Sequence, residues 1–188
     1  EFLPNPEGVL CSDGSDDCVS GDSKFIFDFG KDSSDMPQGE WVELYNNGDT
    51  AVDVTGWYLR DSTPGEGNKT PINTDHILAA SPTVPAHGWL VVYMNKPIYN
   101  NTGDTVRLFD FSDALIDSYS YGTDPDYCEQ TPTPGDENAG DGSGTPPCSP
   151  GEPIPGNKSY ARIPDGLGDW MDPIPTQGGP NILEENAI

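Results

Sequence analysis

The stretch between Gln38 and Asp61, QGEWVELYNNGDTAVDVTGWYLRD, constrains the fold of this chain most strongly. It contains two apolar runs that alternate with polar residues at the period of a β-strand. The segment NNGD between them consists of residue types that tolerate left-handed backbone angles and so favour a chain reversal. The pattern predicts a β-hairpin with Val42 and Leu44 on one face. Because an isolated hairpin is marginal in water, further strands must cover that face.

Other apolar runs of strand length are bounded by turn residues. They are KFIFDF at 24–29, WLVVYM at 89–94, DTVRLFDF at 104–111, LIDSYSYG at 115–122 and SYARI at 159–163. WLVVYM is apolar on both faces, which predicts either a central strand covered on both sides or one half of a sandwich near its densest point. No helical period of useful length occurs, so we expect an all-β sandwich of about seven to nine strands. The predicted core residues are Val42, Leu44, Val54, Trp57, Leu90, Val92, Val106, Leu108 and Ile116.

Composition divides the chain into three parts. Residues 1–22 contain two of the four cysteines among acidic and small residues, and we expect an irregular, disulfide-pinned leader. Residues 23–181 contain the strand-like runs and form the predicted sandwich, and 182–188 form a tail. Within the sandwich, residues 123–157 include fourteen prolines and glycines among thirty-five residues. Such a segment buries too little apolar surface to offset its ordering entropy, which predicts a long irregular insertion.

Four cysteines, Cys11, Cys18, Cys128 and Cys148, are present and none lies in a CxxC pair. Only two histidines accompany them, so a zinc site is not favoured. An even number of cysteines indicates two disulfides and an oxidising, secreted or cell-surface location, the alternative being four free thiols. Of the three possible pairings we favour Cys11–Cys18 and Cys128–Cys148, because each closes a short polar loop.

Charge excludes several classes of partner. Thirty-two acidic residues against eight basic ones give a formal net charge of −24. A polyanion is repelled by nucleic-acid phosphates and by anionic membrane surfaces. No apolar run approaches the length of a transmembrane helix, so membrane insertion is not expected. The charge is explained by solubility, by adaptation to salt or by binding of divalent cations.

Two clusters of aspartates are candidate calcium ligands. Asp13, Asp16 and Asp17 lie in the leader, and Asp124, Asp126 and Asp141 lie in the insertion. Oxygen ligands on glycine-spaced loops suit Ca²⁺, the one cofactor that the sequence suggests. The leader does not contain an EF-hand, because Cys18 occupies the position of the required glycine and no closing glutamate follows. Solvated charge is the alternative explanation.

Aromatic residues supply the candidate binding surface, and nothing indicates catalysis. Trp41, Tyr58, Tyr119 and Tyr121 fall opposite apolar neighbours, which predicts an exposed platform for a peptide or a sugar. An exposed sheet edge is a further place where a partner's strand could bind. The carboxylates Glu40 and Glu43 are three apart in a strand and so point to opposite faces. No GxSxG motif occurs, and His87 lies in an exposed turn.

Five motifs occur in an order that is similar to the lamin-tail domain. They are GEWVELYN, DVTGWYLRD, PAHGWLVVYM, GDTVRLFDFSDALIDSYSYG and SYARIPDGLGDWMDPIPTQGGPN. The resemblance covers roughly Phe25–Asn181 and implies an immunoglobulin-like β-sandwich. The insertion at 123–157 and the cysteine-containing leader depart from the family pattern, and no coiled-coil heptads occur. The acidic, cysteine-containing chain resembles the prokaryotic members, which occur on exported or surface proteins.

The resemblance implies no catalytic residues. We therefore expect a non-catalytic binding or structural module of a secreted or cell-surface protein, whose partner is an unknown protein or glycan surface. Two alternatives stay open: an accessory domain of a secreted hydrolase, such as a nuclease or protease, and a calcium-dependent adhesion domain.

Overall fold

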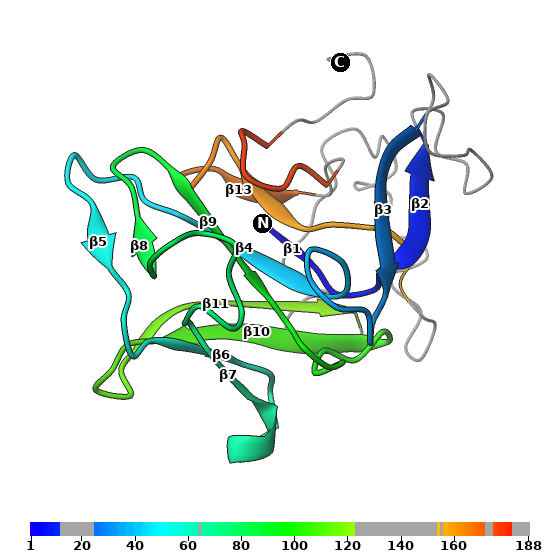
Figure 1. Cartoon of the computed structure of the whole chain (residues 1–188), viewed down its shortest axis with the longest axis horizontal. Coiled ribbons are helices and arrows are strands. Elements are labelled where there is room, and N and C mark those ends of the chain that lie inside the picture. Colours follow the sequence, from blue (N-terminus) through cyan, green and yellow to red (C-terminus); the bar gives the residue numbers. More distant parts are fainter. Residues whose placement is uncertain (12–24, 64, 123–153, 155, 172–174, 182–188) are drawn as a thin grey trace, which may run out of the picture.

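The computed structural model describes residues 1–11, 25–63, 65–122, 154, 156–171 and 175–181. These residues form thirteen β-strands, one short 3-10 helix and no α-helix, which confirms the all-β prediction (Figure 1). The strands are β1 Phe2–Leu3, β2 Glu7–Cys11, β3 Phe25–Lys31, β4 Trp41–Tyr45, β5 Val52–Asp53, β6 Tyr58–Arg60, β7 Lys69–Pro71, β8 Thr83–Val84, β9 Trp89–Tyr93, β10 Gly103–Phe109, β11 Leu115–Gly122, β12 Ala161–Ile163 and β13 Asp169–Met171. The 3-10 helix η1 spans Glu66–Asn68.

Two sheets form the sandwich. One has the order β1-β4-β9 and the other has the order β11-β10-β6-β7. In Figure 1 the four-stranded sheet runs along the lower side, with β4 and β9 above it. Phe2, Val54, Leu59 and Val92 are each at most 1% exposed in the core cluster that the two sheets share. Burial of their apolar surface is the main favourable contribution to the fold.

The predicted hairpin between 38 and 61 is wrong, because its two strands lie in different sheets. β4 pairs with β1 and β9, whereas β6 pairs with β10 and β7. The Asn46 side-chain amide donates to the carbonyls of Thr50, Val84 and Pro85, which binds the intervening loop to the segment before β9. Alternation in the sequence identified both strands but could not identify their partners.

The strand WLVVYM is covered on both faces as predicted, but it is not central. β9 is an outer strand of the three-stranded sheet among the described residues, and β4 lies in the middle. Leu90 and Val92 face the sandwich core, and Val91 and Tyr93 pack in a second cluster on the other face. The two faces of β9 are therefore covered by other layers of the fold. An apolar run in the sequence indicates that both faces are covered, but it does not indicate whether the strand is central or outer in its sheet.

The predicted core is largely confirmed. Val42, Val54, Leu90, Val92 and Val106 are buried, and Leu44, Trp57 and Leu108 pack partly buried against them. Ile116 is wrong, since it is 47% exposed. Between β10 and β11 the register changes from Leu108↔Asp117 to Phe109↔Leu115, so Ile116 is an extra residue without a partner on β10. The buried residues Tyr119 and Tyr121 define the inner face of β11, and Ile116 lies an odd number of residues from both, so alternation does not place it on that face.

The first eleven residues are part of the fold, contrary to the prediction of an irregular leader. Phe2 and Leu3 are 1% and 0% exposed, and the ring of Phe2 lies 5.3 Å from that of Tyr160. β2 pairs with β3 beside the sandwich (Figure 1). Residues 12–22 lie outside the described residues. Strands as short as β1 and β2, with glycine and proline residues in or beside them, give little periodic signal in the sequence, which explains the error.

The end of the predicted insertion also belongs to the sandwich. Ile154 and Asn157 are buried, and their backbone N–H groups donate to the carbonyls of Asn101 and Asn5 at 2.7 and 2.9 Å. The fold therefore resumes before 157. Residues 123–153 of the insertion, and the predicted tail at 182–188, lie outside the described residues.

Candidate functional site

A groove of about 340 Å³ opens between β4, β11 and the β12–β13 hairpin. Ligand sites are typically concave, mostly apolar and of about 300 to 1,000 Å³, so this groove is large enough to accept side chains of a partner. Most of its apolar lining is partly buried or exposed, whereas Val54 and Val84 in the lining are buried. The lining includes Leu44, Val52, Trp57, Leu108, Ile116 and Trp170.

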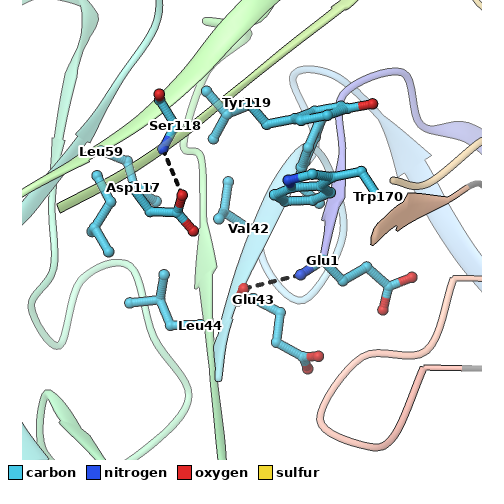
Figure 2. A pocket seen from close by; sticks show the side chains of 12 residues that line it. Glu1, Val42, Glu43, Leu44, Leu59, Asp117, Ser118, Tyr119 and Trp170 are labelled. Carbon is cyan, nitrogen blue, oxygen red and sulfur yellow. Dashed lines mark hydrogen bonds between the residues drawn. The ribbon is translucent and has the colours of Figure 1, made fainter. Parts of the chain in front are cut away.

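A smaller cavity of about 60 Å³, whose lining is shown in Figure 2, shares several lining residues with the groove. Phe2, Val42, Leu59 and Val106 line this inner cavity, which shares Leu44, Leu108 and Trp170 with the groove. Packing of the aromatic residues fixes one wall. Trp170 stacks on Tyr119 with ring centroids 4.2 Å apart, and the Arg162 guanidinium lies 4.9 Å from the Trp170 ring. The groove therefore has a largely preformed apolar wall.

Glu43 lines both the groove and the inner cavity although it is only 4% exposed. Its Oε2 accepts a hydrogen bond from the Gly178 N–H. Burial raises the pKa of this carboxyl to about 8, against the opposing effect of nearby positive charge and of the Gly178 bond. At neutral pH Glu43 therefore carries a proton for most of the time, and a cation brought next to it would favour the ionised form.

Asp117 connects the groove to the edge of the sheet. Its Oδ1 accepts hydrogen bonds from the Ser118 N–H at 2.9 Å and from Arg162 Nη2 at 3.4 Å. Among the described residues β11 is the outermost strand of its sheet. Leu115 and Ile116 on this strand are 53% and 47% exposed. The edge thus combines a backbone amide held by a side chain with two solvent-facing apolar residues, beside an apolar groove.

The four aromatic residues predicted to form an exposed platform are buried, so that prediction is wrong. Trp41, Tyr58, Tyr119 and Tyr121 are 0%, 5%, 7% and 0% exposed. Trp41 packs with Leu3, Phe29 and Tyr93 under the β2–β3 hairpin. Tyr119 and Tyr121 lie on the inner face of β11, as the register partners of the buried residues Val106 and Asp104. Tyr119 still contributes to the site, since it lines the inner cavity.

The calcium and disulfide predictions concern mostly other parts of the chain. Asp13, Asp16, Asp17, Asp124, Asp126 and Asp141 all lie outside the described residues, so the calcium site stays a prediction. Within the described part, no three His, Cys, Asp or Glu side chains are placed to hold a metal ion.

Of the four cysteines, Cys11 lies in the described part of the chain, and it is disulfide-bonded. Cys18, Cys128 and Cys148 lie outside the described residues, so the pairing stays a prediction.

The carboxylates Glu40 and Glu43 have separate partners, as expected for side chains on opposite faces of a strand. Glu40 is fully buried, and its carboxylate accepts hydrogen bonds from the backbone N–H groups of Ile98 and Tyr99. Burial raises the pKa of Glu40 to about 9 in spite of these bonds. Spacing in the sequence predicted that the two carboxylates do not act together, but nothing in it signalled that both are buried.

His87 occupies an exposed turn, as predicted. Its backbone has a φ of 49°, and its Nε2 lies 2.9 Å from Asp49 Oδ1. Both side chains are more than half exposed, at 54% and 97%.

In the described part of the chain, no helix is long and apolar enough to span a membrane.

Sequence reasoning missed the groove itself. The sequence predicts Leu44, Trp57 and Leu108 as core, and Arg162 and Trp170 are not among the predicted site residues. The groove forms because β12–β13 packs beside β1, through the bridge between Phe2 and Tyr160, and brings residues from both ends of the chain together. No local pattern shows such a contact.

Comparison with known families identifies the fold. The model of the lamin tail domain matches residues 25–123, which is more than half of the chain and includes β3 to β11. The expected closing motif at 159–181 lies beyond this match. Neither curated proteins nor solved structures give a match. Members are non-catalytic, immunoglobulin-like β-sandwich modules, in agreement with the two sheets described above. The chain belongs to the lamin tail domain family.

Proposed function

We propose that this chain is a non-catalytic binding module that takes up an extended segment of a partner protein along β11. The observation that carries the proposal is the exposed, bulged edge of β11 directly beside the groove. A strand added to a sheet edge gains main-chain hydrogen bonds, and pockets for alternate side chains give it specificity. The Ser118 N–H, which donates to Asp117 Oδ1 in this structure, is one group that would donate a hydrogen bond to a carbonyl of the partner strand.

The chemistry of the groove indicates the kind of segment. Alternate side chains of an added strand would point into the apolar lining formed by Leu44, Trp57 and Leu108. The remaining side chains would face a molecule of net charge −24. Asp117 also places a carboxyl group at the groove. A segment in which apolar and basic residues alternate is therefore the best complement.

A secreted or cell-surface location is part of the proposal. Disulfides persist in oxidising compartments, and Cys11 is disulfide-bonded. The acidic composition and the cysteines support a module of the prokaryotic type. The same edge and groove would serve such a module whether it stands alone or accompanies a hydrolase.

The test uses a fluorescein-labelled octapeptide of alternating lysine and valine, measured by fluorescence anisotropy in 0.15 M salt. Its control is a peptide of the same charge with a central proline, which cannot pair as a strand. We expect the alternating peptide to bind at least about tenfold more tightly, a difference of about 1.4 kcal/mol. Equal binding of the two peptides would show attraction to negative charge alone and would contradict the proposal.

A pair of matched variants locates the site. Ile116→Asp should weaken binding of the alternating peptide, because it places a charge at the apolar edge. Leu78→Asp adds the same charge at a residue that is 63% exposed and lies outside the groove lining. It should bind as the unaltered chain does. Both variants increase the attraction for a cationic peptide, so weaker binding by Ile116→Asp alone cannot be a charge effect.

A further inference from the structure

A row of three cations crosses the outer face of the four-stranded sheet. Arg107 of β10 is the register partner of Arg60 of β6, which is in turn the partner of Lys69 of β7. Partners on adjacent strands have their side chains on the same face of a sheet. The neighbouring row, Leu108–Leu59–Thr70, faces the core, so the three cations face away from it.

This cation row is unusual for the chain's composition. The whole chain has eight basic residues among 188 and thirty-two acidic ones. Within the described residues neither Arg60 nor Arg107 forms an ion pair, and Lys69 has only Glu66, at 3.9 Å and with a 90% exposed side chain. Like charges directly opposite one another destabilise a sheet. Random placement of so few cations is a poor explanation for three that are adjacent.

Aromatic rings hold two of the three cations of the row, Arg60 and Lys69, in place. The Arg60 guanidinium lies 4.7 Å from the Phe109 ring centroid, and Lys69 Nζ lies 3.9 Å from that of Tyr58. The two rings stack at 5.0 Å with an angle of 11°. These two cations are thus preorganised, which reduces the entropy lost when a ligand binds. Because the cations cover the rings, no free aromatic face is left here for a sugar to stack on.

We propose that the cation row is a second binding site, which takes a carboxylate-rich segment of a partner polypeptide. Adjacent strands are about 4.8 Å apart, so the row spans about 10 Å. Carboxylates on the same face of an extended segment are about 7 Å apart, so two of them can contact the row at once. Arginine forks bind carboxylates with paired hydrogen bonds, and no carboxylate of the described residues already occupies those of Arg60 and Arg107.

The net charge of the molecule does not prevent this contact. At physiological ionic strength charges are screened beyond about 8 Å, so a docked segment experiences mainly the three cations and the nearest acidic groups. Two acidic groups beside the row are Glu66, 3.9 Å from Lys69 Nζ, and Asp113, which accepts a hydrogen bond from the Tyr58 hydroxyl at 2.9 Å. The cation row lies on the opposite face of β10 from Leu108, which lines the groove. The two sites can therefore hold a basic and an acidic segment at the same time.

The test uses fluorescein-labelled hexaglutamate, with hexaglutamine as the neutral control, and anisotropy at two salt concentrations. Arg107→Gln and Lys69→Gln should each weaken hexaglutamate binding about tenfold, as expected for a lost charge-assisted hydrogen bond. Lys31→Gln makes the same charge change on β3, away from the row, and should leave binding unchanged. Glu66→Gln removes the competitor for Lys69 and should strengthen binding.

Folding and the proposed function are controlled separately. Arg107→Gln relieves a like-charge contact, so its melting temperature should stay level or rise by about 1 to 3 °C, and loss of binding cannot then reflect unfolding. Binding of the alternating lysine–valine peptide should not change, so each site can fail independently of the other. Three outcomes would overturn the inference: no hexaglutamate binding, equal effects of Lys31→Gln and Arg107→Gln, or binding of a sulfated oligosaccharide in place of hexaglutamate. Self-association abolished by Arg107→Gln would likewise overturn it and assign the row to a second copy of the chain.

Discussion

Buried carboxyl groups are the least expected feature at the scale of single residues. Glu40 is 0% exposed and caps the backbone N–H groups of Ile98 and Tyr99, which fixes the chain after β9. Desolvation favours the protonated form strongly enough to raise its pKa to about 9. The sequence places Glu40 beside an apolar strand but cannot show that its side chain turns inward, because that depends on where residues 98 and 99 lie.

Glu40 should make stability depend on pH. Between its ordinary pKa of 4.5 and its folded pKa of about 9, the folded state binds more protons than the unfolded state. The free energy of unfolding should therefore fall as pH rises, by at most about 1.4 kcal/mol per pH unit for this group. Glu40→Gln removes this titration, so urea unfolding at pH 6, 7, 8 and 9 should show a flatter profile for the variant. Profiles of equal slope would contradict the assignment.

Leu59 should contribute more to stability than any exposed leucine. It is 0% exposed at the centre of the sandwich, so Leu59→Ala should lower the free energy of unfolding by about 2 to 5 kcal/mol. Leu78→Ala, at a residue that is 63% exposed, should change it by less than about 0.5 kcal/mol. Denaturant unfolding of the two variants measures both values. A similar loss in each would mean that the core lies elsewhere.

At the scale of elements, strands were predictable and their partners were not. The predicted runs at 104–111 and 115–122 correspond to β10 and β11, which pair as an antiparallel hairpin. The run at 38–61 was read as a hairpin because a polar turn usually joins adjacent strands. Here the loop is bound to other strands through Asn46, which leads the chain into the second sheet. The sequence does not indicate the candidate site for the same reason, since its β12–β13 wall depends on the distant bridge between Phe2 and Tyr160.

The end of the β10–β11 hairpin needs a glycine. Gly122 has a φ of +75°, and a Cβ there would lie 2.3 Å from the Cα of its register partner Gly103. Gly122→Ala combines backbone strain with a clash, so it should cost more than about 1 kcal/mol of stability. Gly67→Ala is the matched control, because its Cβ would meet nothing within 4 Å. Equal melting temperatures for the two variants would contradict the register described here.

At the scale of the whole molecule, the charged side chains are unevenly distributed. A net charge of −24 disfavours the compact state through self-repulsion, so monovalent salt should stabilise the protein. Against that background three cations lie in one row on the sheet, and the groove on the other side of β10 is apolar with carboxyl groups beside it. The sequence supplied the total charge but not this separation, which arises from strand register.

The calcium hypothesis is tested on the same scale. If the aspartates at 13, 16, 17, 124, 126 and 141 bind Ca²⁺ in the folded state only, a hundredfold excess over the dissociation constant should add about 2.7 kcal/mol of stability. Thermal unfolding at fixed ionic strength compares millimolar calcium with magnesium and with a chelator. We expect a higher melting temperature in calcium. A response to ionic strength alone would leave the charge as solvated surface.

The central claim, that an extended segment pairs with β11 beside the groove, is tested most directly by amide NMR. A ¹⁵N-labelled chain is titrated with the alternating lysine–valine octapeptide. The claim predicts saturable shifts concentrated at Leu115–Ser118 and at the Trp170 indole, with slower hydrogen exchange at the Ser118 amide as it gains a carbonyl partner. Shifts spread over the acidic surface, with unchanged exchange at Ser118, would contradict it.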